Sequence, residues 1–239
     1  MALLSSADRI QSHISHTHPW DVSMDEARAI QDRLSPEVRS CSLRETADRA
    51  IRTVAGVDVS IRGDWAKAAV SVLELPDLNV VGEAVYACEV PFPYVPGFLS
   101  FREMPAILPA LDRLLQDTGT LPDVLVTDSQ GYAHPRRFGL ACHLGVVLDR
   151  PAFGVAKSIL TGTPDGDLSA KKGSTVALVD ADETVGVALR TRTNVNPVYV
   201  SIGHRMTLGE AVDLTLRCSP RYKIPETTRH AHRLSQMKT

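Results

Sequence analysis

The 239-residue sequence predicts an α/β protein built on one mixed sheet, in which three antiparallel strands precede parallel strands and helices lie on the flanks. Two observations lead to this fold class. In the first half of the chain, β-branched and apolar runs are separated by short turn sequences. Further along, apolar runs of strand length alternate with helical periodicity, which indicates parallel pairing through crossover helices. This order of elements is typical of a ribonuclease H-like sheet.

The antiparallel part is expected over three runs near the start of the chain. Residues 53–60 (TVAGVDVS), 67–75 (KAAVSVLEL) and 80–90 (VVGEAVYACEV) are largely apolar. The sequences IRGDWA and PDLN join them, and both are turn signals of a length that suits antiparallel neighbours. A meander is therefore expected to open the sheet.

The elements after the meander alternate in type. Helices are expected at 100–117, 139–148 and 207–217, strands at 123–128, 152–158 and 197–203, and a hairpin at 174–191. The residues after 221 read as a polar tail. No repeat or low-complexity block suggests a second domain, so residues 23–239 are expected to form one domain.

The N-terminal residues 1–22 are expected to form a flexible arm. They are polar and rich in Ser, Thr and His. His13, His16 and His18 could bind zinc, but no Cys or carboxylate lies at a suitable spacing, so a mobile arm is the preferred interpretation. An amphipathic helix capped by Ser23 follows.

Composition narrows the possible functions and locations. The net charge of −2 and the pI of about 6.4 give no general attraction to nucleic acid, which counts against a protein that binds only phosphates. No apolar run approaches the roughly 20 residues of a membrane span, and no secretory signal is recognisable. The four cysteines form no C-x-x-C pair, so reduced thiols and a cytoplasmic location are expected.

Three acidic residues stand where a catalytic site is expected. Asp58 interrupts an apolar strand, and Asp128 closes the strand DVLVTD. A buried lone carboxylate costs several kcal/mol unless a partner or a metal compensates it, and the carboxyl ends of strands in open α/β sheets bind ligands. Glu103, near the start of a helix, would complete a set of oxygen ligands for Mg²⁺. Two such cations about 4 Å apart can hydrolyse a phosphodiester.

Two further features could belong to the same site. Lys157 ends an apolar strand, where it could either reach solvent or place a positive charge beside a phosphate. The segment PYVPGFLSFRE, residues 93–103, combines two prolines, a glycine and three rings ahead of Glu103. A loop this stiff and apolar is expected either to insert into a partner or to be covered.

Six segments, taken in order, resemble the successive sequence blocks of the endonuclease V family. They are VAGVDVS, PYVPGFLSFRE, DSQGYAHPRRFGLACHLGV, GVAKSIL, SIGHRMTLGEAVDL and KIPETTRHAH. The resemblance implies a ribonuclease H-like fold and a DNA repair enzyme that cleaves the second phosphodiester on the 3′ side of deoxyinosine. It also implies Mg²⁺ as the cofactor, with Mn²⁺ able to replace it. A monomer is expected, although the sequence itself does not reveal the oligomeric state.

The resemblance assigns catalytic roles to five residues. Asp58, Glu103 and Asp128 fall at the metal-dependent centre, with Asp58 and Asp128 as metal ligands. Lys157 matches the active-site lysine of the family. His232 falls where members carry a histidine or an aspartate near that centre.

The resemblance also assigns substrate-binding residues, which are Tyr94, Pro96, Gly97, Leu99, His134 and Arg136. The first two match a wedge that parts the strands at the lesion, where an aromatic ring can fill the space of an extruded base. Gly97 and Leu99 match the pocket for the everted base, and the remaining pair matches an HPR element near the DNA. Ser129 departs from the family pattern, which has a glycine there, so the range of lesions is open at this point.

Three other functions remain open from the sequence. An enzyme with the same chemistry could cut inosine-containing RNA, because one sequence does not show whether a 2′-hydroxyl is accepted. A non-catalytic nucleic-acid-binding module of the same fold would have no need of acids near phosphate. A phosphatase or nucleotidase acting on a small substrate would leave the wedge loop unexplained.

Overall fold

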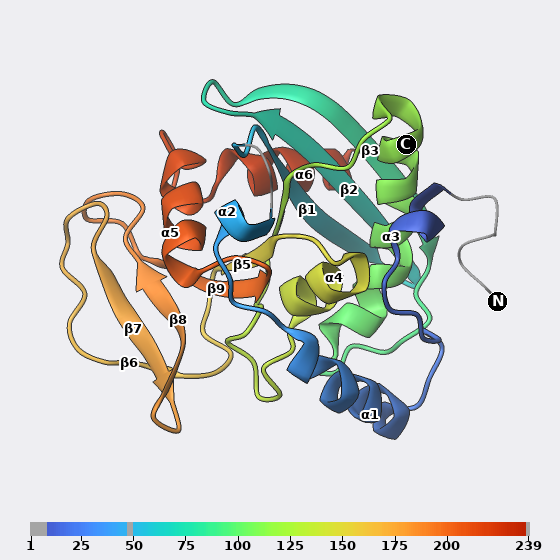
Figure 1. The fold of residues 1–239 in the computed structure, drawn as a ribbon, viewed down its shortest axis with the longest axis horizontal. Helices are drawn as coiled ribbons and strands as arrows, with labels where there is room; N and C mark the ends of the chain where they lie inside the picture. Colours follow the sequence, from blue (N-terminus) through green and yellow to red (C-terminus); the bar gives the residue numbers. More distant parts are fainter. Residues whose placement is uncertain (1–8, 47–49, 238–239) are drawn as a thin grey trace.

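The computed structural model describes residues 9–46 and 50–237, and a single mixed sheet runs through them (Figure 1). The strands are β1 (Thr53–Arg62), β2 (Trp65–Glu74), β3 (Asn79–Glu89), β4 (Val124–Thr127), β5 (Ala152–Ala156), β6 (Thr163–Pro164), β7 (Thr175–Asp180), β8 (Glu183–Leu189) and β9 (Val198–His204). The helices are α1 (Met24–Leu34), α2 (Leu43–Thr46), α3 (Leu99–Thr118), α4 (Leu140–Leu148), α5 (Leu208–Arg217) and α6 (Glu226–Gln236), with 3₁₀ turns η1 (Arg9–His13) and η2 (Ser35–Glu37).

The strand order is β3-β2-β1-β4-β5-β9-β8-β7-β6. Strands β1, β2 and β3 pair antiparallel through the two predicted turns. Strands β4 and β5 then add in parallel to β1, with α3 and α4 as crossovers. Strand β9 returns antiparallel to β5, and β8, β7 and β6 extend that edge. The predicted mixed sheet, with an antiparallel meander followed by parallel strands, is confirmed.

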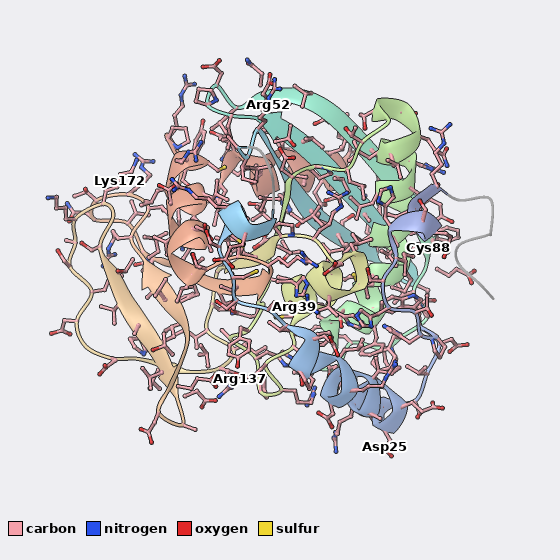
Figure 2. The ribbon with its side chains drawn as sticks, viewed as in Figure 1. Asp25, Arg39, Arg52, Cys88, Arg137 and Lys172 are labelled. Atoms are coloured by element: carbon pink, nitrogen blue, oxygen red, sulfur yellow. The ribbon has the colours of Figure 1, made fainter. Side chains whose placement is uncertain are left out.

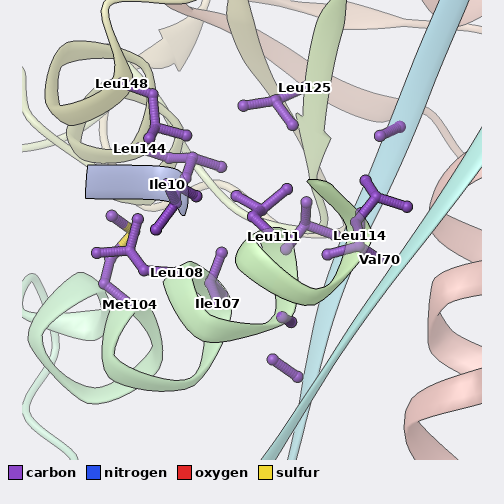
Figure 3. Packing of buried hydrophobic residues seen from close by; sticks show 14 of the residues in the cluster. Ile10, Val70, Met104, Ile107, Leu108, Leu111, Leu114, Leu125, Leu144 and Leu148 are labelled. Carbon is purple, nitrogen blue, oxygen red and sulfur yellow. The ribbon is translucent and has the colours of Figure 1, made fainter. Parts of the chain in front are cut away.

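The main core lies between α3 and the sheet, as Figure 3 shows. The apolar face of α3 meets one face of β1 and β2, and α4 extends this layer. Buried residues labelled in this cluster are Ile10, Val70, Met104, Ile107, Leu108, Leu111, Leu114, Leu125, Leu144 and Leu148. Burying side chains of this size stabilises the fold by about 1.5–3 kcal/mol each relative to leaving them exposed. This layer fixes α3, and with it Glu103, against the sheet.

The opposite face of β1 carries α6, whereas the sequence pattern predicts only a polar tail after residue 221. Its buried residues are small or polar, namely Thr227, Thr228, Ala231 and Ser235, so the sequence shows no apolar periodicity that would predict a helix. The helix can lie close to the strand because Gly56 has no side chain: a Cβ there would stand 2.1 Å from the backbone of Thr227. This close contact brings His232 to the sheet.

The N-terminal segment is packed from Arg9 onward, in contrast to the flexible arm expected over residues 1–22. Ile10 is fully buried, and its backbone N–H donates to Asp112 of α3. His18 stacks edge-on against Trp20 and hydrogen-bonds to His143 of α4. The apolar and aromatic residues hidden among the polar ones fix this segment. Residues 1–8 lie outside the described residues.

The hairpin formed by β7 and β8 extends the sheet at one end of the molecule (Figure 1). Arg137, labelled in Figure 2, ties it to the body through ion pairs with Asp180 at 2.8 Å and Glu183 at 2.7 Å. Glu183 also accepts a hydrogen bond from Tyr132. Among the described helices, none has the length and apolarity needed to cross a membrane.

Candidate active site

The two aspartates meet because β1 and β4 are parallel neighbours. Their last paired residues are Val57 and Thr127, so Asp58 and Asp128 are the next residues of adjacent strands. Strands so paired lie about 4.8 Å apart. Both side chains are mostly buried, with 10% and 12% of their surface exposed. The structure therefore places the two aspartates side by side at one edge of the sheet, as the sequence predicts.

Glu103 reaches the same place from the second turn of α3. It lines a cavity of about 80 Å³ together with Asp58 and Asp128, and the apolar side chains Val57, Val59, Ile107 and Leu140 complete the walls. Burial and the two neighbouring carboxylates raise the pKa of Glu103 to about 8. Three acids thus share one poorly solvated space, which favours either a proton or a cation there.

Two basic side chains face the aspartates. Lys157, just beyond β5, pairs with Oδ2 of Asp128. His232 of α6 places Nδ1 3.2 Å from Oδ2 of Asp58. Ser235, one turn later, donates to the same oxygen at 2.7 Å. Ser235 was missed by sequence reasoning, since only an expected helix at 226–236 could have placed it beside His232.

The donor set suits a hard divalent cation by its chemistry, because three carboxylates supply oxygen ligands. Glu103 supports this fit: within residues 9–46 and 50–237, its carboxylate has no hydrogen-bond or ion-pair partner. Across those same residues, however, no three His, Cys, Asp or Glu side chains stand in a finished metal-binding arrangement. Instead, Asp58 contacts His232, and Asp128 forms an ion pair with Lys157.

A second cavity lies next to the acids and is lined by three of the six residues assigned to substrate binding. Gly97, Leu99 and His134 line it. The other lining residues are Gln31, Ser100, Ser129, Gln130, Gly139, Leu140 and Leu160. Leu140 also lines the acid cavity, so the two spaces share a wall. The hydroxyl of Ser129 donates to Thr127 at 2.8 Å, which accommodates this departure from the family pattern within the wall.

His134 and Arg136 hold the loop that enters this cavity. Nε2 of His134 donates to the Gly97 carbonyl at 3.0 Å, and its Nδ1 accepts from the Arg136 N–H at 3.1 Å, which defines a neutral tautomer. Burial, followed by the charge of Arg136, lowers the pKa of His134 to about 4. The HPR element therefore acts on the protein's own backbone in this structure.

The aromatic loop divides into a buried and an exposed part. Phe98 and Phe101 pack in a core with α1 and α4. Tyr94 is 70% exposed, and Pro96 is exposed beside it. Neither of these two lines the second cavity. Tyr94 is thus an exposed ring on a proline-containing loop, three residues before Gly97 of the second cavity.

A chain of hydrogen bonds links the N-terminal segment to the cavity wall. Ser100 donates to Nδ1 of His143, whose Nε2 donates to Nε2 of His18 at 2.7 Å, and Nδ1 of His18 donates to the carbonyl of Pro19. Burial lowers the pKa of both histidines, which keeps them neutral. Nothing in the sequence pairs His18 with His143, because 125 residues separate them.

The mixed sheet with its acids at one rim defines a ribonuclease H-like nuclease fold. The sequence model of the Endonuclease V family matches residues 33–233, and the chain belongs to that family. Endonuclease V of Roseiflexus castenholzii is 50% identical over 221 residues, which are 92% of this chain and 96% of that protein. The family identifies the chain as a nuclease.

Solved structures agree with this assignment. The crystal structure of Endonuclease V from Streptomyces avermitilis is 44% identical, with a TM-score of 0.83 over 91% of this chain and 93% of that one. Endonuclease V of Ciona intestinalis has the same fold at 24% identity, with a TM-score of 0.78 over 90% of this chain and 97% of that one. The Ciona protein was crystallised with a 23mer DNA containing an inosine followed by a ribo-adenosine.

Proposed function

We propose that this protein is a monomeric cytoplasmic DNA repair endonuclease that hydrolyses the second phosphodiester bond 3′ to deoxyinosine. The observation that carries the proposal is the acid cavity of Asp58, Glu103 and Asp128 sharing the wall residue Leu140 with a second cavity beside an exposed ring. A phosphate cut near a base that has left the helix needs both spaces side by side.

The protein's own residues supply positioning and charge. Lys157 places an ammonium group at Asp128, where it can stabilise negative charge on the phosphate. His232 donates through Nδ1 to Asp58, which leaves Nε2 available to exchange a proton with water. Tyr94 fills the space of the everted base, and stacking of this kind is worth about 1–3 kcal/mol.

Asp58 and Asp128, assisted by Glu103, would hold Mg²⁺, or Mn²⁺ in its place, and the cation would polarise the phosphate and activate water. Hypoxanthine differs from guanine by the missing 2-amino group, and from adenine by O6 and the N1 proton. A close-fitting cavity would exclude the amino group, and backbone N–H groups would select O6. The cavity around Gly97 and Leu99 has a volume of about 50 Å³, so its walls would have to move apart to admit a base.

The Asp128→Ala variant tests the catalytic assignment. Removing this carboxylate takes away a metal ligand and the partner of Lys157, while the second cavity and Tyr94 stay intact. We expect binding of a deoxyinosine duplex in Ca²⁺ to survive within a few-fold, whereas Mg²⁺-dependent nicking disappears. A gel assay of nicking together with fluorescence anisotropy measures both.

Matched substrates complete that experiment. The wild-type protein is expected to nick deoxyinosine DNA and to release no phosphate from free IMP, which a nucleotidase would do. RNA strands with inosine at the same position decide whether ribose is also accepted. Nicking that persists in Asp128→Ala would remove Asp128 from the catalytic centre.

Tyr94→Ala tests the wedge. The exposed ring makes no contribution to the core, so the free energy of unfolding should change by less than about 0.5 kcal/mol. Nicking of duplex deoxyinosine DNA should fall about tenfold or more, because one stacking contact is lost, and nicking of single strands should fall much less. An equal loss on both substrates would contradict a strand-parting role. Initial rates on the two substrates provide the measurement.

A further inference from the structure

Gln31 is a buried polar residue whose entire amide is used. It lies on α1 with 1% of its surface exposed, and it lines the second cavity. Its Nε2 donates to the carbonyls of Gly97 at 3.0 Å and Phe138 at 3.2 Å. Its Oε1 accepts from Nε of Arg136 at 2.6 Å. The residue therefore joins α1, the loop after the wedge, and the HPR segment at one point.

The Gly97 carbonyl is the centre of this arrangement. It accepts hydrogen bonds from Gln31, from Nε2 of His134 at 3.0 Å, and from Nη2 of Arg136 at 2.8 Å. On the other side of the same peptide group, the Phe98 N–H donates to the Val95 carbonyl at 3.0 Å. The peptide plane between the wedge and the cavity is thus fixed at both ends.

This fixation matters because the backbone at Gly97 is unusual. Its φ of +83° lies in the left-handed region, which leaves glycine several ways to relax if the carbonyl is released. A rotation of this peptide would move Leu99 and Ser100, which line the cavity. Arg136 is held in turn, since it also stacks over the Phe98 ring at 4.4 Å.

We infer that Gln31 is a positioning residue that sets the shape of the base cavity and so its selectivity for the everted base. This inference rests on the proposed function, because it assigns the cavity to a base. Gln31 lies before residue 33, where the match to the family model begins, and it forms part of neither the acid cavity nor the wedge. Its amide is suited to the task because it donates to two carbonyls and accepts from an arginine at once.

Two substitutions test this amide, one removing all its hydrogen bonds and the other only its donor groups. Gln31→Met keeps the length of the side chain but removes every hydrogen bond. Gln31→Glu keeps the acceptor for Arg136 and places a carboxylate oxygen against the Gly97 carbonyl instead of a donor. We expect both variants to lower kcat/KM for deoxyinosine DNA about tenfold or more, mainly through KM, because the Gly97 carbonyl loses its link to α1 and is then held by His134 and Arg136 alone. The ratio of cleavage at deoxyinosine to cleavage at deoxyguanosine or deoxyadenosine should fall by a similar factor.

Ile30→Ala is the matched control. Ile30 precedes Gln31 on α1 and is buried in an apolar cluster, so its truncation loosens the same helix without touching the amide. Selectivity and KM should stay near wild type in this variant, even where its melting temperature falls as far as that of Gln31→Met. An equal loss of selectivity in Ile30→Ala, or wild-type KM and selectivity in Gln31→Met, would overturn the inference.

Hydrogen exchange gives a readout that needs no substrate. The Phe98 amide should exchange at least tenfold faster in Gln31→Met than in Ile30→Ala or the wild type. Failure of the wild type to cut deoxyinosine DNA would count against the proposed function, whereas unchanged exchange at Phe98 counts against the positioning role. The two ideas therefore fail through different observations.

Discussion

Glu103→Gln is expected to make the protein more stable in the absence of divalent cations and at the same time to abolish nicking. The wild-type carboxyl is partly buried and faces Asp58 and Asp128, and the loss of solvation together with these two charges raises its pKa from 4.5 to about 8. One pKa unit corresponds to about 1.4 kcal/mol. At pH 7 this carboxyl therefore lowers the free energy of unfolding by an amount on the order of 3 kcal/mol. A neutral amide of the same shape removes this destabilisation.

The pH dependence of this difference follows from the direction of the shift. Because the folded state binds the proton more tightly than the unfolded state, the protonated carboxyl favours folding below pH 4.5. That advantage is lost as pH rises towards about 8. The gap in unfolding free energy between Glu103→Gln and the wild type should therefore widen from pH 5 to pH 8. Urea unfolding in EDTA across this range measures it.

Glu210→Gln provides a control of opposite sign. Glu210 accepts hydrogen bonds from the N–H and hydroxyl of Thr207, from Leu43 and from Ser42. These bonds outweigh burial and lower its pKa, so this substitution should destabilise the protein by about 1 kcal/mol at pH 7. A Glu103→Gln protein that is less stable than the wild type at pH 7 would contradict the claim that the ionised Glu103 destabilises the fold beside Asp58 and Asp128.

Gly56→Ala is expected to displace α6 and to destabilise the protein strongly. The new Cβ would lie 2.1 Å from the carbonyl carbon and oxygen of Thr227 and 2.5 Å from the Thr228 nitrogen, all backbone atoms at the start of α6. Backbone cannot move aside like a flexible side chain, so α6 must shift as a whole. We expect a loss of about 3 kcal/mol or more in unfolding free energy.

The same substitution should also impair catalysis. His232 and Ser235 contact Asp58 from α6, so a shifted helix withdraws both side chains from Asp58. Gly209→Ala is the matched control, because its Cβ would meet nothing within 4 Å and α5 should gain up to about 1 kcal/mol. Thermal melts and nicking rates at a temperature where both variants are folded test this. Wild-type stability in Gly56→Ala would show that α6 does not lie so close.

The sheet and two acids of the proposed catalytic site could be predicted because their signals are local. The alternation of apolar runs with turn residues marks β1 to β5, and an acid inside or just after such a run, as at Asp58 and Asp128, is energetically conspicuous. Glu103 and Lys157 are less conspicuous singly: Glu103 was predicted only as a partner of Asp58 and Asp128, and Lys157 at its strand end had two possible roles until the family resemblance favoured one. His232 depended on that resemblance alone.

Other parts of the site could not be predicted because small polar contacts over long separations create them. Helix α6 buries threonine, alanine and serine, which carry no periodic apolar signal. The packed segment from Arg9 to Asp21 depends on partners more than 100 residues away, such as Asp112 and His143. Gln31 looks like an ordinary helix residue until Gly97 is placed beside it.

The docking of residues 9–21 on α3 and α4 also constrains the order of events during synthesis. Ile10 meets Asp112 across 102 positions, and His18 meets His143 across 125. At roughly 5–20 residues per second, a ribosome needs about ten seconds to deliver those partners. Until then the leading segment has nowhere to bind and stays within reach of chaperones. A nascent chain arrested before residue 143 should therefore present this segment to proteases, and one arrested well beyond it should protect the segment.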